Sequence, residues 1–291
     1  MRDHQTVDYA KRIDRALSAI EQACRAGKAP ALSEVAEAAA LSEYHFHRIF
    51  RLMTAETVRQ TIERVRLGGS LPVLAKSGIM AATGQSGYAT SQSFARAMRR
   101  RVGEAPRALA ADEGLRVAAG ESLRHQTSSA DSGDGTAPPL AVEIVNFEPV
   151  QLVAVRNIGD YAALNVGYDR VFEIVMEDLG EDSIQAIYGI AHHDPAAFAA
   201  EELVFDCAVE PSRRTRDREE LRAFETPGGR ALHMVHHGDY DCIHAAVDRL
   251  YEATVAQGFL LSDALPLLHY RTPPDIMPDD ELLSDIYLFL G

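Results

Sequence analysis

Tryptophan is absent from this chain of 291 residues, and only three cysteines occur. Cys24, Cys207 and Cys242 are odd in number and far apart, which excludes a disulfide framework and a CxxC metal motif. No run of about 18 apolar residues is present, so we expect no membrane span. The first eight residues lack the apolar segment of a secretory signal peptide. The sequence therefore predicts a cytoplasmic protein with no membrane partner.

Positive charge is scarce overall and concentrated in one half of the chain. The net charge is −14, but residues 1–125 contain 19 Lys and Arg against 13 Asp and Glu, whereas residues 126–291 contain 10 against 30. A basic half favours the phosphates of nucleic acid, and an acidic half repels them. Because 291 residues exceed one ordinary domain, we expect two domains with different partners.

A polar segment separates two different patterns. Residues 126–139 are rich in Ser, Gly, Asp and Pro and lack apolar periodicity, which predicts a linker. Before it the apolar residues recur at helical spacing, and after it short strands alternate with helices. The sequence thus predicts an all-α domain at residues 1–111, a linker at residues 112–139 and an α+β domain at residues 140–291.

Two segments of the first domain share one pattern. Residues 42–53 and 91–101 each open with a serine expected to cap a helix, place a phenylalanine three or four residues later, and space arginines along the other face. Ser33 is expected to cap another short helix upstream. Two basic helices, each preceded by a turn, suit a protein that reads successive major grooves of DNA.

Several short motifs accompany these helices. They are Leu32-Ser33-Glu34-Val35-Ala36, Leu41-Ser42, His45-Phe46-His47-Arg48-Ile49-Phe50-Arg51, Arg64-Val65-Arg66-Leu67, Gly87-Tyr88, Ser91-Gln92-Ser93-Phe94-Ala95-Arg96 and Gly103-Glu104-Ala105-Pro106. In this order they resemble the DNA-binding domain of AraC/XylS-family regulators over about residues 5–108. The resemblance implies two helix-turn-helix units joined by one long helix, whose recognition helices enter one face of duplex DNA about one helical turn apart.

The joining helix departs from that family. It meets Gly68, Gly69 and Pro72, and Gly84 lies in the first helix of the second unit. Each glycine costs a helix about 1 kcal/mol and a proline about 3 kcal/mol. We therefore expect that the joining helix ends early or that the second unit docks loosely.

Candidate DNA-contacting residues follow from the polar faces of the two helices. They are Glu43, Tyr44, His47, Arg48 and Arg51 in the first unit, and Thr90, Ser91, Gln92, Ser93, Arg96, Arg99 and Arg100 in the second. The first turn of each helix would meet base edges, and the arginines would meet bases or phosphates. The alternative is that both faces are simply solvated surface.

The second half contains an internal repeat at an offset of 79 residues. Gly159-Asp160-Tyr161 corresponds to Gly238-Asp239-Tyr240, and Asp206 corresponds to Asp285. Each copy is predicted to run strand, turn, helix and two strands. The first strands span 151–157 and 230–236, and the helices span 163–179 and 242–257, so the repeats cover about 150–210 and 229–290. In the last strand of each copy aliphatic residues alternate with acids and aromatics, which predicts an aliphatic face under the helices and an acidic, aromatic face opposite.

With its Gly-Asp-Tyr turns and closing Asp285-Ile286-Tyr287-Leu288, this half resembles the GyrI-like effector-binding domain over residues 140–291. The resemblance implies a small amphiphile, often cationic and aromatic, bound in a cleft between the repeats beside an acidic side chain. The ligand-binding candidates are Asp285, Tyr287, Asp206, Tyr188 and Tyr270. A carboxylate among aromatic rings attracts cations. Alternatively, the two acids are solvated residues of the sheet.

Other chemistry finds little support in the residue spacing. The pairs His192-His193 and His236-His237 are adjacent strand residues whose side chains point to opposite faces, so we predict no metal site and no cofactor. Tyr161 and Tyr240 are expected to pack at their turns, and no catalytic triad can be argued from spacing.

The sequence predicts a ligand-responsive transcriptional regulator rather than an enzyme. Its partners would be a double-stranded DNA operator and a small-molecule effector, with RNA polymerase as a further candidate; the oligomeric state stays open. Because some relatives of the GyrI-like domain are hydrolases, the resemblance leaves a small-molecule hydrolase as one alternative. The other is a protein-interaction module that uses the acidic half.

Overall fold

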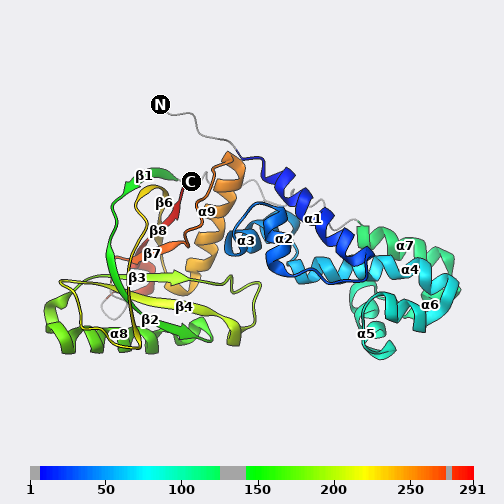
Figure 1. Cartoon of the computed structure of the whole chain (residues 1–291), viewed down its shortest axis with the longest axis horizontal. Coiled ribbons are helices and arrows are strands. Elements are labelled where there is room, and N and C mark those ends of the chain that lie inside the picture. Colours follow the sequence, from blue (N-terminus) through cyan, green and yellow to red (C-terminus); the bar gives the residue numbers. More distant parts are fainter. Residues whose placement is uncertain (1–6, 125–141, 273–276) are drawn as a thin grey trace. The chain divides into compact units, whose positions relative to one another are not determined.

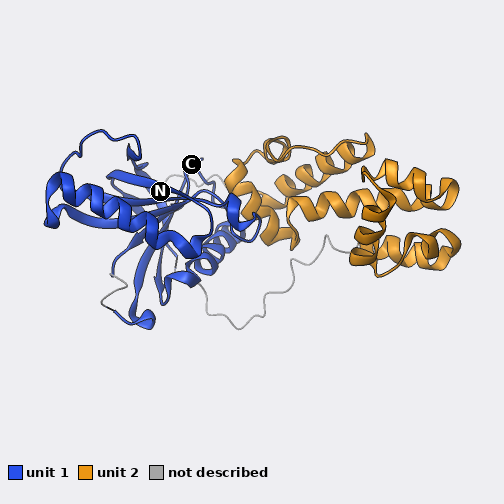
Figure 2. Ribbon diagram, turned by 90° about the horizontal axis from the view of Figure 1, so that it is seen from below, with its two compact units in different colours: residues 1–7, 136–291 blue, residues 8–135 orange. Residues whose placement is uncertain are grey.

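Helices alone build the first half of the described chain, and an antiparallel sheet with two long helices builds the second (Figure 1). The structure is a computed structural model that describes residues 7–124, 142–272 and 277–291. It divides into a helical unit, residues 8–135, and a sheet unit, residues 136–291 with 1–7 (Figure 2). The predicted pairing of an all-α with an α+β domain is confirmed. Within the described ranges no helix is long and apolar enough to cross a membrane.

The helical unit contains two helix-turn-helix units. Its helices are α1 (Tyr9–Arg25), α2 (Leu32–Ala38), α3 (Glu43–Thr54), α4 (Val58–Gln85), α5 (Ser91–Val102), α6 (Pro106–Ala111) and α7 (Glu113–Arg124). The first unit pairs α2 with α3, and the second pairs residues 79–85 of α4 with α5. Both recognition helices are amphipathic: Phe46, Ile49 and Phe50 of α3 and Phe94 and Met98 of α5 are buried.

The helix caps differ from those predicted. Thr90 is the N-cap of α5 and accepts a hydrogen bond from the backbone N–H of Ser93 at 3.1 Å, so Ser91 is the first helical residue. Ser42 occupies the N-cap position of α3, but its side chain makes no capping bond in the described structure. Ser33 lies inside α2, where the Glu34 carboxylate accepts from the preceding backbone N–H instead. Among these three described helices, only in α5 does a hydroxyl one position away from the predicted cap accept from a first-turn N–H.

The expectation that the joining helix ends early is wrong. Helix α4 continues through Gly68, Gly69 and Pro72, and its interruption lies at Gly78, where φ is 79° and ψ is −177°. Gly78 separates the joining helix from the first helix of the second unit. Helices α1, α6 and α7 all pack on α4, and Leu67 is buried in that contact. Burial on several sides outweighs the local cost of glycine and proline.

A buried carboxylate ties the second unit to the joining helix. Glu56, which is 5% exposed, forms an ion pair with Arg64 at 2.9 Å and accepts from the hydroxyl of Thr61 at 3.0 Å. It also pairs with Arg101, which lies in the last turn of α5. Because a buried charge without partners is costly, these contacts oppose any displacement of α5.

A second tie lies closer to the surface. Glu63 of α4 accepts a hydrogen bond from the hydroxyl of Tyr88 at 2.9 Å and pairs with Arg100 of α5 at 2.6 Å. Burial and the bond to Glu63 raise the pKa of Tyr88 to about 12. The two ties hold α5 at two points of α4, which is the opposite of loose docking.

The predicted linker at residues 112–139 begins with a helix. Residues 113–124 form α7, which buries Ala119 and Leu123 against α4, and the carbonyl of Leu123 accepts from Arg64 at 3.0 Å. Leu and Ala side chains at helical spacing form an apolar stripe in this segment. The polar residues between them make the segment look like part of the linker in the sequence. The remainder of the predicted linker lies outside the described residues.

The sheet unit is one antiparallel sheet of eight described strands. The strands are β1 (Glu143–Phe147), β2 (Gln151–Ile158), β3 (Ile184–Ala191), β4 (Val204–Pro211), β5 (Leu221–Glu225), β6 (Gly229–His237), β7 (Leu267–Tyr270) and β8 (Leu283–Phe289), in the order β1-β6-β8-β7-β3-β4-β2-β5. Helices α8 (Leu164–Leu179) and α9 (Ile243–Gln257) complete the two predicted repeats, which meet where β3 pairs with β7.

An edge strand that the sequence did not suggest lies before each repeat. Strand β1 precedes the first repeat but pairs with β6 of the second, and β5 precedes the second but pairs with β2 of the first. The exchange links the two repeats at both ends of the sheet.

The two faces of the sheet differ as the alternation predicts. Helix α8 lies along β2 and β4 (Figure 1), where Val153 and Val209 pack with Val171 and Val175 of the helix. The residues between them in the strands point the other way. We call the opposite side the polar face, because both acids of the repeat, Asp206 and Asp285, lie on it. It also carries an apolar cluster that includes Ala208, Tyr287 and Phe289.

Replacing Glu56 by Gln should lower the free energy of unfolding by about 3 kcal/mol, because two arginines would lose the charge of a buried partner. The matched control is Glu63→Gln, which should cost less than about 1 kcal/mol because Arg100 is 69% exposed. Urea unfolding measures both. Equal losses in the two variants would contradict the role given to Glu56.

Candidate functional site

The exposed surface of α5 gathers most of the predicted contacts of the second unit. Thr90, Gln92, Arg96, Arg99 and Arg100 are exposed, whereas Ser91 and Ser93 are half-buried. Arg96 and Arg99 make no ion pair with any residue that the structure describes, while Arg100 is bound to Glu63. The hydroxyls of Thr90 and Ser93 are 3.1 Å apart and take part in the cap. Gln92, Arg96 and Arg99 therefore remain available for a ligand of negative charge.

The predicted contacts of the first unit are distributed differently. Glu43 of α3 is exposed, Tyr44 and Arg51 are half-buried, and His47 and Arg48 are buried at 9% and 1%. The sequence placed all five on a face pointing away from the apolar side of the helix. The first unit matches the AraC/XylS pattern more completely, yet its candidate residues are less exposed than those of the second unit.

On the polar face, Asp206 is held by two arginines and one histidine. Its carboxylate forms two hydrogen bonds with Arg156, at 2.7 and 2.9 Å, one with His192 at 2.7 Å and one with Arg222 at 3.1 Å. Burial acts to raise the pKa of Asp206, but the bonds and charges of His192 and Arg156 outweigh it and lower the pKa well below the usual range. The carboxylate is therefore a fixed negative charge.

Asp285 occupies the corresponding place in the second repeat with different partners. It contacts His233 at 2.8 Å, His269 at 3.2 Å and Arg271 at 2.9 Å. The register places Asp285 in line with His269, Tyr188 and Ala208, so Asp206 lies three strands away and two residues along β4. At about 4.8 Å per strand and about 3.4 Å per residue, the two acids are roughly 16 Å apart on one face.

Aromatic rings surround only the second of these acids among the described contacts. His269 stacks on Tyr188 with ring centroids 4.7 Å apart, and His233 stacks on Tyr287 at 4.9 Å. The structure therefore brings together Asp285, Tyr287 and Tyr188 through two histidines. It places Asp206 on the same face but farther along the sheet.

Tyr270 does not join this group. It follows His269 in β7, so its side chain points to the opposite face, where it packs on Tyr168 of α8 at 5.9 Å and on Tyr240 at 4.7 Å. Adjacent residues of a strand point to opposite faces, so an assignment of β7 from the sequence would have placed Tyr270 and His269 on different faces.

The two tyrosines of the Gly-Asp-Tyr turns serve the fold, as predicted. Tyr161 donates to the carbonyls of His193 and Val204, each at 3.0 Å, and Tyr240 donates to those of Thr272 and Leu283. The four acceptors are related by the same offset of 79 residues. Each hydroxyl thus fastens its turn to the last strand of its own repeat.

Sequence reasoning missed the cations around the acids. His233 lies in β6, whereas His269 lies in β7 and Arg271 directly follows that strand, and no motif joins the two places. Arg156 of β2 and Arg222 of β5 also lie far apart in the sequence. A period-two count through β6 and β8 places His233 and Asp285 on one face, but the pairing of those strands is not visible in the sequence. For metal binding, no group of three or more His, Cys, Asp or Glu side chains with suitable placement occurs in the described ranges.

Comparison with known families agrees with this architecture. Residues 140–290, more than half of the chain, match the family model of a GyrI-like small molecule binding domain. The chain belongs to this family. Residues 35–112 match the model of a helix-turn-helix domain, which confirms the AraC-type resemblance. A helix-turn-helix domain joined to a GyrI-like domain is the composition of a DNA-binding regulator with an effector domain.

Solved structures resemble parts of the chain at low identity. The EcmrR–DNA complex aligns at 14% identity over 50% of this chain and 56% of EcmrR, with a TM-score of 0.45. The C-terminal domain of EcmrR aligns at 13% over 53% of this chain and 99% of that domain, with a TM-score of 0.47. A hydrolase from Listeria innocua aligns at 15% over 54% and 94%, with a TM-score of 0.37. No curated protein sequence matches the chain.

The pairing of Asp206 predicts an acid-dependent stability of the GyrI-like domain. Because its pKa is depressed in the folded state, its stabilisation is complete above the unfolded value near 4 and is lost as pH falls from there toward the folded value. Asp206→Asn should cost about 2 kcal/mol at pH 7, less than a fully buried pair, since Arg156 and Arg222 are 36% and 50% exposed.

Urea unfolding of this domain at pH 7 and at pH 3 measures the effect. The difference between wild type and Asp206→Asn should shrink at the lower pH. Asp217→Asn, at an exposed pair with Arg214, is the control and should leave both values unchanged. A difference that stays constant with pH would contradict the assignment.

Proposed function

We propose that the protein is a ligand-responsive transcriptional regulator that binds a specific duplex DNA site through α3 and α5. The observation that carries this proposal is the exposed polar face of α5, on a helix held to α4 by two ties. A recognition helix needs both features: side chains free to reach base edges, and a fixed position relative to its partner helix.

The joining helix has a suitable length. Residues 58–77 of α4 precede the interruption at Gly78, and at 1.5 Å per residue they extend about 30 Å. Successive major grooves on one face of B-DNA are separated by about 34 Å. This spacing supports contact with two adjacent grooves.

The side chains of α5 divide into two roles. Gln92 suits a bidentate contact with adenine. Arg96 and Arg99, without internal partners in the described chain, suit phosphates, and Arg100 would reach DNA only by leaving Glu63. In α3 the exposed Glu43 and the half-buried Tyr44 and Arg51 are the more accessible candidates for DNA contact. His47 and Arg48 are buried and would contact DNA only after a local rearrangement that exposes them.

The effector site would lie on the polar face beside Asp285. The half-buried rings of Tyr287, His233 and His269 lie next to the negative charge, and the buried Tyr188 supports His269 from behind. Arg271 is 46% exposed and is the partner that a cationic effector would replace. A hydrophobic molecule with a cationic group fits this chemistry. Effector binding would shift the population of DNA-bound protein, and RNA polymerase would be a partner at the promoter.

Arg96→Ala and Arg99→Ala should each weaken operator binding and make it less dependent on salt. Each lost phosphate contact should reduce the slope of log K against log[salt] by about 1. Gln92→Ala should instead reduce sequence preference and leave the slope unchanged. Mobility shift with genomic fragments over a salt series measures these effects.

The control for the DNA experiment is Lys11→Ala, in the first turn of α1, which should bind as wild type does. Failure of the wild-type protein to select any sequence at moderate salt would overturn the proposal. Unchanged binding by Arg96→Ala and Arg99→Ala would reject their assignment alone.

For the effector, 2-naphthylmethylammonium should bind, and Asp285→Asn should weaken it about tenfold through loss of the charge partner. The neutral 2-naphthalenemethanol should be insensitive to that change, and the exposed Asp263→Asn is the control. Calorimetric titration gives the affinities. Equal binding of the alcohol would reject a cationic effector.

Incubation with an ester of the same ring system, 2-naphthyl acetate, distinguishes a sensor from a hydrolase, because the ammonium and alcohol probes contain no hydrolysable bond. Hydrolysis of the ester at the uncatalysed rate supports sensing, whereas protein-dependent release of 2-naphthol and acetate would support the hydrolase alternative. Capture of a basic protein in place of every small molecule would favour the protein-interaction alternative.

A further inference from the structure

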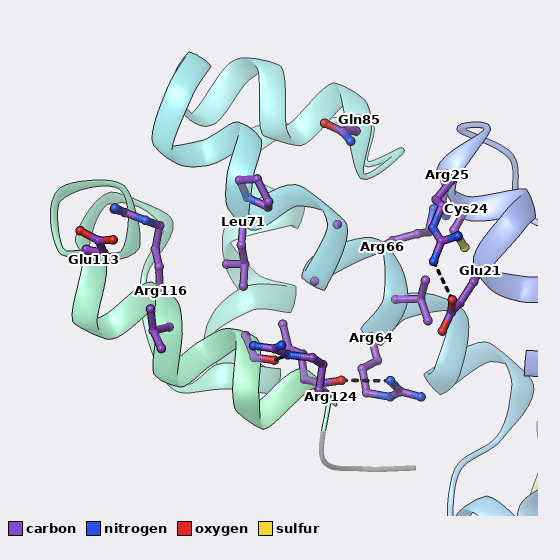
Figure 3. A pocket seen from close by; sticks show the side chains of 17 residues that line it. Glu21, Cys24, Arg25, Arg64, Arg66, Leu71, Gln85, Glu113, Arg116 and Arg124 are labelled. Carbon is purple, nitrogen blue, oxygen red and sulfur yellow. Dashed lines mark hydrogen bonds and ion pairs between the residues drawn. The ribbon is translucent and has the colours of Figure 1, made fainter. Parts of the chain in front are cut away.

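A cavity of about 610 Å³ lies within the helical unit, between α1, α4 and α7 (Figure 3). Its volume falls in the range of small-molecule sites. It is lined by no residue of α5 and by none of the sheet unit. Its floor is the stretch of α4 around Gly68, Gly69 and Pro72, the same stretch that departs from the AraC/XylS pattern.

The two glycines leave space that side chains would fill. A Cβ atom on Gly69 would meet nothing within 4 Å, and one on Gly68 would meet the Cβ of Leu123 at 3.9 Å, an ordinary contact. Both residues lie in α4 with helical backbone angles, so neither conformation nor close packing requires glycine. Glycine lowers the stability of a helix. Its effect at these positions is an open cavity floor.

The cavity wall is basic. Five arginines and two glutamates line it: Arg25, Arg64, Arg66, Arg116 and Arg124 against Glu21 and Glu113. Several of the arginines have internal partners. Arg25 pairs with Glu21 at 2.8 Å, Arg64 pairs with Glu56, and Arg116 donates to the carbonyl of Leu109 at 2.7 Å.

Arg66 is different, because it makes no hydrogen bond or ion pair with any residue in the described part of the chain. It is half-buried, its guanidinium lies against the Cα of Gly87, and Figure 3 shows it beside Cys24. Burial raises the pKa of the Cys24 thiol, although the charge of Arg66 acts to lower it. A half-buried guanidinium with no such internal partner can donate charge-assisted hydrogen bonds to an anionic ligand.

Apart from Cys24 and Gln85, the rest of the lining is apolar. Leu71 and Leu123 are buried in the wall, and Val117 of α7 is 51% exposed at the cavity. A ligand with a hydrophobic body would cover Val117 and lie over the bare backbone of Gly68 and Gly69.

We propose that this cavity binds a small hydrophobic monocarboxylate, whose carboxylate accepts from Arg66 and whose apolar body lies against Gly69, Leu71 and Val117. The site is distinct from the effector site beside Asp285. Binding itself does not depend on the proposed function.

Its consequence for DNA does rest on that function. The cavity also contains Gln85, at the end of α4, and Arg66 touches Gly87 in the turn before α5. A carboxylate on Arg66 would thus act next to the turn that positions the second recognition helix. A second effector would in this way adjust DNA binding from inside the helix-turn-helix domain.

The test uses the full chain and calorimetric titration with benzoate, 2-naphthoate and decanoate. At least one of the three carboxylates should bind, and its neutral amide should bind at least tenfold more weakly. Gly69→Leu fills the floor and should weaken the carboxylate at least tenfold. Arg66→Gln should do the same through loss of charge.

Matched controls separate the site from general effects on α4. Gly84→Leu introduces the same side chain at an exposed helical glycine that also has nothing within 4 Å and lies outside the cavity. Arg59→Gln removes an exposed arginine from the same helix. Both should bind the carboxylate within about twofold of wild type.

Three outcomes would overturn the proposal. The first is that none of the three carboxylates binds, and the second is that the amide binds as well as its acid. The third is that Gly69→Leu and Arg66→Gln both leave the affinity within twofold, which places the carboxylate elsewhere, for example beside Asp285. Because these measurements contain no DNA, a failure of the operator experiments would leave them unaffected.

Discussion

A carboxylate buried away from water needs basic side chains as ion-pair or hydrogen-bond partners, and three carboxylates with such partners hold parts of this protein in place. Glu56, Asp206 and Asp285 are each 5% exposed or less, and each meets at least two basic side chains. In the helical unit these contacts join α4 to α5. In the sheet unit the two carboxylates lie on the polar face, one in each repeat. Because removal of either partner leaves an uncompensated charge, these contacts fix positions that apolar packing alone would leave adjustable.

The duplicated frame of the GyrI-like domain carries an unequal pair of sites. The turns are equivalent in both repeats, down to the two carbonyls that each tyrosine hydroxyl meets. Around the acids the equivalence ends. Where the second repeat has His233, His269 and Tyr287, the first has Ala154, Ile190 and Ala208 at the same offset. The repeat thus supplies the scaffold, and divergence at these three positions supplies the aromatic surface near Asp285.

Much of the architecture could be predicted because it follows from local patterns. Helical periodicity, the turns before Glu43 and Ser91 and the strand alternation around Asp206 and Asp285 all depend on neighbours in the chain. Predictions failed where distant residues decide. Propensity argued for a break at Gly68, yet packing of α7 carries the helix on to Gly78. The cap of α5 failed for a local reason instead: Thr90 and Ser91 are both capping residues, and Thr90 is the one whose hydroxyl accepts from the N–H of Ser93.

The sequence by itself determined the two domains, the repeat and the sides of the strands, because each is encoded in composition or periodicity. Only the tertiary structure decided which cations meet which acids, that Tyr270 lies apart from Asp285, and that Arg64, Arg101 and Glu56 form one cluster. It also showed the cavity over Gly68 and Gly69. The physical reason is that these features depend on strand pairing and helix packing between residues far apart in the chain, whereas propensity and alternation report only on near neighbours.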